Sequence, residues 1–210
     1  MPRSGQRFEH GNVRGFLHGP GDDPLGALVI AHGAGSNCEA PLLVAVADSF
    51  AAAGWLALRF DLPYRQARPK GPPLNSGKQD REGIRQAAAA LREHALGCPM
   101  YLAGHSYGGR MCTMLAAEDP QVASALLLLS YPLHPPKQPA KPRTEHFPAL
   151  RVPAFFVHGT KDAFGSVEEM DTARQLIPAR TRLMPVERAG HGLPAGIAGQ
   201  IVQWFSFFVS

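Results

Sequence analysis

One serine in this chain has the surroundings that nucleophilic chemistry requires. Ser106 lies in the pattern G-x-S-x-G, between Gly104 and Gly108, after an apolar strand-like run and before a helix-like run. A sharp turn from strand to helix leaves room only for glycine two residues before and two residues after the serine. A serine that merely caps a helix would occupy the same place. The flanking glycines favour a nucleophile that attacks an electrophilic carbon.

A serine hydroxyl needs a base, and the base needs an acid that orients it. The predicted acid is Asp162, which follows the apolar run 152–157, and the predicted base is His191, which follows the run 182–187. Each follows a strand-like run, in the order serine, acid, histidine that such sites use. A turn aspartate and a backbone-bonded histidine are the plainer alternatives. Rival acids lie within an expected helix and would face solvent or the core: Glu168, Glu169 and Asp171.

Backbone amides are the predicted stabilisers of negative charge on a reacting oxygen. One belongs to Tyr107, directly after the serine, and the other to Ala34, in the glycine-rich turn after the apolar run 27–31. The glycines of that turn could instead serve only to reverse the chain. We expect further residues to line the substrate site: Gly33, Gly35, Tyr64, Arg65 and His105.

Three histidines near predicted strand ends, His32, His105 and His158, raise the question of a zinc site. Zinc ligands normally include acidic or cysteine residues at regular spacing, and none accompanies these histidines. We therefore expect neither a metal nor a cofactor.

Composition limits the class of protein. The chain has 210 residues, 45% of them hydrophobic, which suits one domain over residues 1–210, with 1–12 as a flexible start. The net charge of +4 is spread out, so no nucleic-acid partner is expected. Three cysteines without regular spacing and no apolar leader favour the cytoplasm. The apolar stretch 197–209 is too short to span a membrane and is expected to form a helix on the core.

Strand-like and helix-like runs alternate from residue 26 onward, which predicts an α/β fold. We expect a mostly parallel, twisted sheet of about six or seven strands with helices on both faces. The stretches 61–77 and 132–148 are rich in proline and are expected to be loops, so no lid domain is encoded. An open site of this kind suits a small acyl substrate with a short acyl chain. The expected strands are 13–17, 27–31, 55–60, 100–103, 125–130, 152–157 and 182–187, and the expected helices are 40–53, 78–95, 107–118, 166–177 and 195–208.

These motifs resemble the alpha/beta-hydrolase superfamily over residues 28–208. The turn 32–35 and the segments 59–64 and 106–110 are similar to a small lidless set related to dienelactone hydrolases. Dienelactone hydrolases of this kind use a cysteine at the nucleophile position, where this chain has Ser106. The resemblance implies a single-domain hydrolase fold, and the departure argues against the dienelactone reaction itself.

The residues and the resemblance together predict a serine hydrolase that cleaves a small carboxylic ester or thioester through an acyl-enzyme. Two alternatives stay open from sequence. One is a binding or scaffold protein that kept the fold, and the other is an acyltransferase that uses the same three residues. The oligomeric state and the natural substrate are not specified by the sequence.

Overall fold

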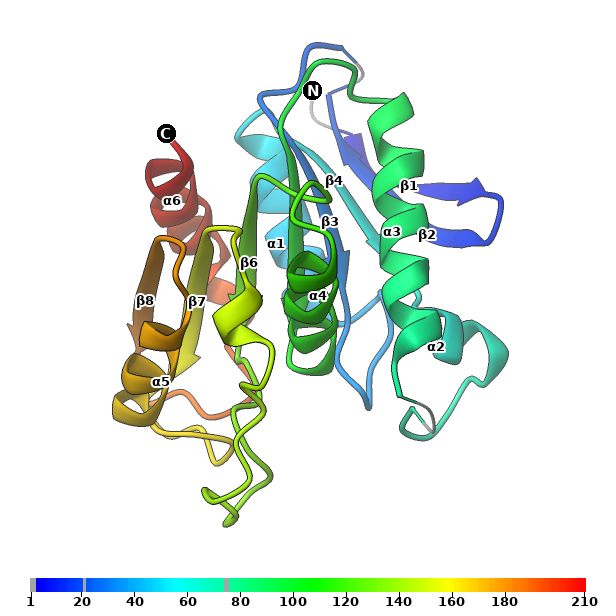
Figure 1. The fold of residues 1–210 in the computed structure, drawn as a ribbon. Coiled ribbons are helices and arrows are strands. Elements are labelled where there is room, and N and C mark those ends of the chain that lie inside the picture. Colours follow the sequence, from blue (N-terminus) through cyan, green and yellow to red (C-terminus); the bar gives the residue numbers. More distant parts are fainter. Residues whose placement is uncertain (1–2, 21, 74–75) are drawn as a thin grey trace.

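The computed structural model describes residues 3–20, 22–73 and 76–210. Within these ranges the chain forms a single eight-stranded sheet in the order β1-β2-β4-β3-β5-β6-β7-β8 (Figure 1). β2 is antiparallel to both β1 and β4, and all other neighbouring strands are parallel. The strands are β1 (Arg3–His10), β2 (Val13–Gly19), β3 (Ala27–Ala31), β4 (Leu56–Phe60), β5 (Met100–His105), β6 (Ala125–Leu129), β7 (Ala154–Gly159) and β8 (Thr181–Val186).

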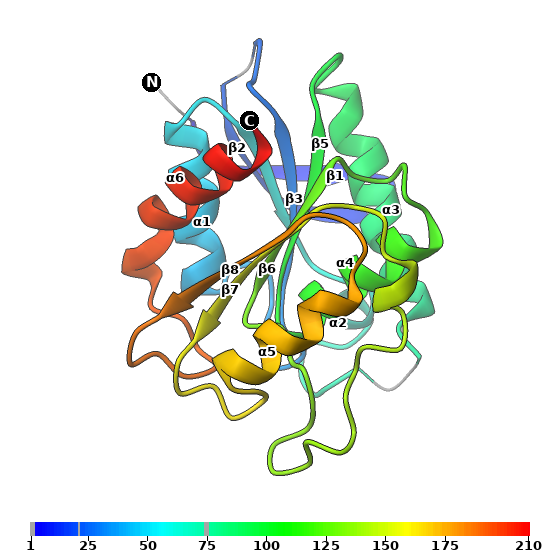
Figure 2. The ribbon, with the colours of Figure 1, turned by 60° about the vertical axis from the view of Figure 1, so that its left-hand side comes forward.

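Helices cover both faces of the sheet, as the alternation predicts. α1 and α6 lie on one face, and α3, α4 and α5 lie on the other (Figures 1 and 2). The helices are α1 (Pro41–Ala52), α2 (Pro63–Ala67), α3 (Lys78–Glu93), α4 (Tyr107–Glu118), α5 (Val167–Ala173) and α6 (Ala198–Val209), with single 3-10 turns at Phe147–Ala149, Arg174–Leu176 and Ala195–Ile197.

β3 and β6 are apolar at every position because both faces of these strands are covered. β6 shows the division clearly: Leu126 and Leu128 pack into the core under α3 and α4, whereas Leu127 and Leu129 pack into the core under α1 and α6. Successive side chains of a strand point to opposite faces, so one leucine run supplies both cores. This double burial holds the strand ends of the parallel sheet at fixed positions.

α6 closes the second core with aromatic contacts. Phe205 is fully buried and packs its ring against the rings of Phe50, Trp55, Tyr101, Phe155 and Phe208. The C-terminal stretch is therefore a helix on the core, as expected. Among the described residues, no helix combines the length and the apolar character needed to cross a bilayer.

Two expectations about elements were wrong. Residues 3–10 of the segment expected to be flexible form β1, while residues 1 and 2 lie outside the described residues. β1 is a polar edge strand in which Phe8 is the only buried side chain among residues 5–10, so its alternation is weak in sequence. The loop expected at 61–77 contains α2, which begins with Pro63, a residue preorganised for the first turn of a helix.

The segment between β6 and β7 contains no inserted domain. Its described residues form an extended loop that protrudes beyond the carboxyl ends of the strands, with only the 3-10 turn Phe147–Ala149 (Figure 1). The described residues form eight strands rather than six or seven, and the architecture is otherwise the lidless α/β fold that the sequence predicts.

The aromatic core under α6 generates a stability prediction. Replacing the buried ring in Phe205→Ala leaves a cavity, and we expect the free energy of unfolding in urea to fall by about 3–5 kcal/mol. Phe207→Ala, on the same helix but 69% exposed, is the matched control and should change it by less than about 0.5 kcal/mol. Equal losses in the two variants would contradict this description of the core.

Candidate active site

Ser106 lies at the turn between β5 and α4 in a strained backbone conformation. Its φ is 52° and its ψ is −114°, a region that non-glycine residues rarely adopt. The two flanking glycines are required by close packing: a Cβ on Gly104 would collide with the backbone nitrogen of Gly109, and a Cβ on Gly108 would lie 2.5 Å from the carbonyl oxygen of Ala31. The turn thus presses α4 against the ends of β5 and β3.

The structure brings the three predicted side chains together. The Ser106 hydroxyl lies 2.8 Å from Nε2 of His191, and Nδ1 of His191 lies 2.9 Å from Oδ2 of Asp162. An ionised carboxylate only accepts hydrogen bonds, so Nδ1 donates to Asp162 and Nε2 accepts from the serine. The Asp162 carboxylate is fully buried, whereas the His191 side chain is 23% exposed. This arrangement can take a proton from the serine during attack on a substrate.

Two further residues hold the imidazole in place, and sequence reasoning missed one of them. The ring of Phe164 lies over the His191 ring, with centroids 4.1 Å apart, and the Phe164 amide donates to Oδ1 of Asp162 at 2.8 Å. His105 packs beside His191, and its Nε2 donates to the His191 carbonyl oxygen at 3.2 Å, while its contact with a substrate stays a prediction. The only feature of the sequence that could have indicated this role for Phe164 is its position two residues after Asp162.

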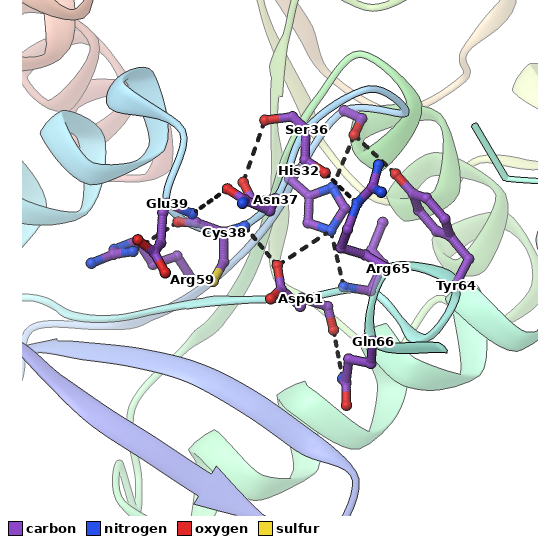
Figure 3. Close-up of polar contacts among 12 residues, drawn as sticks. His32, Ser36, Asn37, Cys38, Glu39, Arg59, Asp61, Tyr64, Arg65 and Gln66 are labelled. Carbon is purple, nitrogen blue, oxygen red and sulfur yellow. Dashed lines mark hydrogen bonds and ion pairs between the residues drawn. The ribbon is translucent and has the colours of Figure 1, made fainter. Parts of the chain in front are cut away.

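The glycine turn after β3 rests on buried polar side chains. His32 accepts a hydrogen bond from the Leu62 amide at Nε2, so its Nδ1 donates to the Gly33 carbonyl oxygen at 2.9 Å (Figure 3). Burial lowers the pKa of His32, which keeps the ring neutral and this pairing intact. The amides of Ala34 and Gly35 donate no hydrogen bond to any residue that the structure describes.

Tyr64 and Arg65, expected near the substrate, donate hydrogen bonds to carbonyl oxygens of the glycine turn after β3. The Tyr64 hydroxyl donates to the Ala34 carbonyl oxygen at 2.8 Å. Nε of Arg65 donates to the Ser36 carbonyl oxygen at 2.7 Å (Figure 3). Arg65 is buried, and its remaining nitrogens donate to other backbone carbonyls. Both side chains thus brace the loop, and direct contact of either with a substrate stays a prediction.

The other predicted site residues, Gly33, Gly35 and Tyr107, differ in how closely other atoms pack around them. No atom lies within 4 Å of a Cβ built on Gly35, so this part of the turn faces open space, whereas Gly33 packs on the ring of His105. Tyr107 begins α4, so its amide has no acceptor within the helix. Its hydroxyl donates to Oδ2 of Asp80 at 2.6 Å.

The histidines considered as zinc ligands have protein partners. His158 donates from Nε2 to the Gly165 carbonyl oxygen at 2.8 Å, and His32 and His105 are paired as described above. In the part of the chain that the structure describes, no three His, Cys, Asp or Glu side chains form a group that could hold a metal ion.

Comparison with known proteins identifies the family. Residues 25–198 match the model of the alpha/beta hydrolase domain, so the chain belongs to the alpha/beta-hydrolase family. A dienelactone hydrolase from Anabaena variabilis is similar over 98% of this chain and 99% of that chain, with 21% identity and a TM-score of 0.76. TT1662 from Thermus thermophilus matches over 100% and 99%, with 23% identity and a TM-score of 0.76.

A third similar structure is Est1E from Butyrivibrio proteoclasticus, which covers 99% of both chains with 16% identity and a TM-score of 0.77. At these identities the likeness is one of fold. Family membership and the lidless hydrolase fold, both predicted from sequence, are thereby confirmed.

The packing of the turn at Ser106 generates a prediction. In Gly108→Ala the new methyl group meets the carbonyl oxygens of Ala31 and His32 at 2.5 and 2.7 Å, and backbone cannot move as a side chain can. We expect the free energy of unfolding to fall by about 1–3 kcal/mol. Gly192→Ala, where nothing lies within 4 Å of the added Cβ, should leave it within about 0.5 kcal/mol. Urea titration measures both, and a harmless Gly108→Ala would contradict the close approach.

Proposed function

We propose that this protein is a serine hydrolase that cleaves a small carboxylic ester or thioester through an acyl-enzyme. The observation that carries the proposal is the continuous hydrogen-bonded series from the Ser106 hydroxyl through His191 to the buried Asp162. Serine is a weak nucleophile unless a base accepts its proton, and this series supplies the base and the group that orients it. Membership of the alpha/beta-hydrolase family supports the same reaction class.

The first half of the reaction forms the acyl-enzyme. Ser106 Oγ attacks the acyl carbon while its proton passes to Nε2 of His191, and the Asp162 carboxylate stabilises the resulting imidazolium. The amides of Ala34 and Tyr107 donate hydrogen bonds to the tetrahedral oxyanion. When the carbon–oxygen or carbon–sulfur bond breaks, Nε2 returns its proton to the leaving alcohol or thiol.

The second half releases the acid. Water enters in place of the leaving group, gives a proton to Nε2 of His191 and attacks the acyl carbon. The second tetrahedral intermediate collapses, the serine regains its proton, and the carboxylic acid leaves. Every proton in this cycle is handled by one imidazole, whose 23% exposure leaves it within reach of water. The substrate is a small acyl compound because no lid domain covers the site.

The nucleophile assignment predicts the behaviour of Ser106→Ala. Removal of the attacking oxygen should lower turnover of a short p-nitrophenyl ester by about 10⁴-fold or more. The fold should persist, because alanine retains the Cβ that the turn already accommodates, and circular dichroism checks this. A folded variant with wild-type turnover would rule out the proposed hydrolase.

The acid assignment predicts a difference between two aspartates. Asp162→Asn keeps the shape but loses the charge that stabilises the imidazolium, and we expect kcat to fall by up to about 10⁴-fold. Asp171→Asn is the matched control, because Asp171 lies on α5, pairs with Arg174 and was a rival acid by sequence. Its kcat should stay within about twofold of wild type. A large loss in Asp171→Asn with a small one in Asp162→Asn would move the acid to α5.

A further inference from the structure

A buried carboxylate on α3 contacts both segments that carry the proposed oxyanion donors. Asp80 is 3% exposed and lies in the first turn of α3. Its Oδ2 accepts a hydrogen bond from the Tyr107 hydroxyl at 2.6 Å, and its Oδ1 accepts one from the Tyr64 amide at 3.0 Å. The two tyrosine rings also meet edge to face, with centroids 5.7 Å apart. One side chain thus joins the segment after β4 to the turn at the serine.

Each of the two tyrosines held by Asp80 restrains a segment that carries one proposed oxyanion-hole amide. Tyr107 supplies its own backbone amide, so holding its ring at Asp80 restrains the start of α4. Tyr64 is held at its amide, and its hydroxyl donates to the Ala34 carbonyl oxygen at 2.8 Å. The same hydroxyl lies 3.1 Å from the Gly33 carbonyl oxygen, which belongs to the planar peptide group that carries the Ala34 amide, so this contact restrains the direction of that amide. The relative position of the two donors therefore depends on Asp80.

Ion pairing does not explain why the Asp80 side chain is buried. No Lys, Arg or His side chain of the described residues lies within ion-pair distance of it. A buried carboxylate without a cation is costly, although the positive end of the α3 dipole and two strong hydrogen bonds reduce that cost. Burial and the contact with Asp80 raise the pKa of Tyr107, so its hydroxyl keeps its proton and donates.

We propose that Asp80 is a positioning residue that sets the geometry of the oxyanion hole by holding Tyr64 and Tyr107 at one carboxylate. The proposal rests on the proposed serine hydrolase function, because the hole has a role only if a tetrahedral oxyanion forms. Asp80 touches no reacting atom; it acts through the backbone of the two segments that it joins.

The test compares Asp80→Asn, Tyr107→Phe and their double variant with wild type. We expect each single variant to lower kcat for a short p-nitrophenyl ester by about ten- to a hundredfold, because sub-ångström misplacement of donors weakens transition-state binding. KM should stay within about twofold. Binding of a phenylboronic acid, which forms a tetrahedral adduct with an active serine, should weaken by the same factor as kcat. The double variant should lose no more activity than Asp80→Asn alone, since Tyr107→Phe removes a hydrogen bond that Asp80→Asn already disturbs.

Tyr131→Phe is the matched control. It also removes a buried tyrosine hydroxyl with a 2.6 Å hydrogen bond, donated to the Arg143 carbonyl oxygen, but in a different loop. Its kcat should equal that of wild type even where its unfolding temperature falls. Should Asp80→Asn fail to fold, Tyr107→Phe, which loses a single oxygen atom, decides the question.

Two sets of results separate the proposals. Wild-type kcat and boronic acid binding in Tyr107→Phe, additive losses in the double variant, or an equal loss in Tyr131→Phe would overturn the role of Asp80 while leaving the hydrolase intact. Full activity of Ser106→Ala would instead overturn the proposed function on which that role rests.

Discussion

The hydrogen bond between Ser106 and His191 is the interaction on which the site depends, and it joins residues 85 positions apart in sequence. The parallel sheet makes this contact possible. β5, β7 and β8 all end at the same edge, so the loops that follow them carry the serine, the aspartate and the histidine to one place. The buried leucine and aromatic layers on both faces keep those strand ends in register.

Beneath this edge lies a second layer of polar contacts that braces the backbone. Tyr64 and Arg65 hold the carbonyls of the glycine turn, and Asp80 holds Tyr64 and the start of α4. Backbone amides aimed at a developing charge are effective only if they are fixed before the reaction. Side chains that donate hydrogen bonds to the carbonyl oxygens of these loops can fix the amides in this way, without contacting the substrate themselves.

Much of this could be predicted from sequence because the signals are local. Apolar runs mark the buried strands, and the strained turn at Ser106 requires glycines at fixed spacing. The polar edge strand β1 was missed because only Phe8 is buried among residues 5–10. Asp80 was not singled out from sequence, and Arg65 was expected only to line the substrate site. Their roles depend on which loop packs on which helix, and no local pattern encodes that packing.

The most direct measurement of the central claim is the mass of the intact protein after treatment with a fluorophosphonate. Such a reagent phosphonylates a serine only when a neighbouring base and an oxyanion hole activate it. The account predicts one adduct per chain, located on Ser106 by peptide mapping, with no adduct in Ser106→Ala. An unmodified wild-type protein, or equal modification of Ser106→Ala, would contradict it.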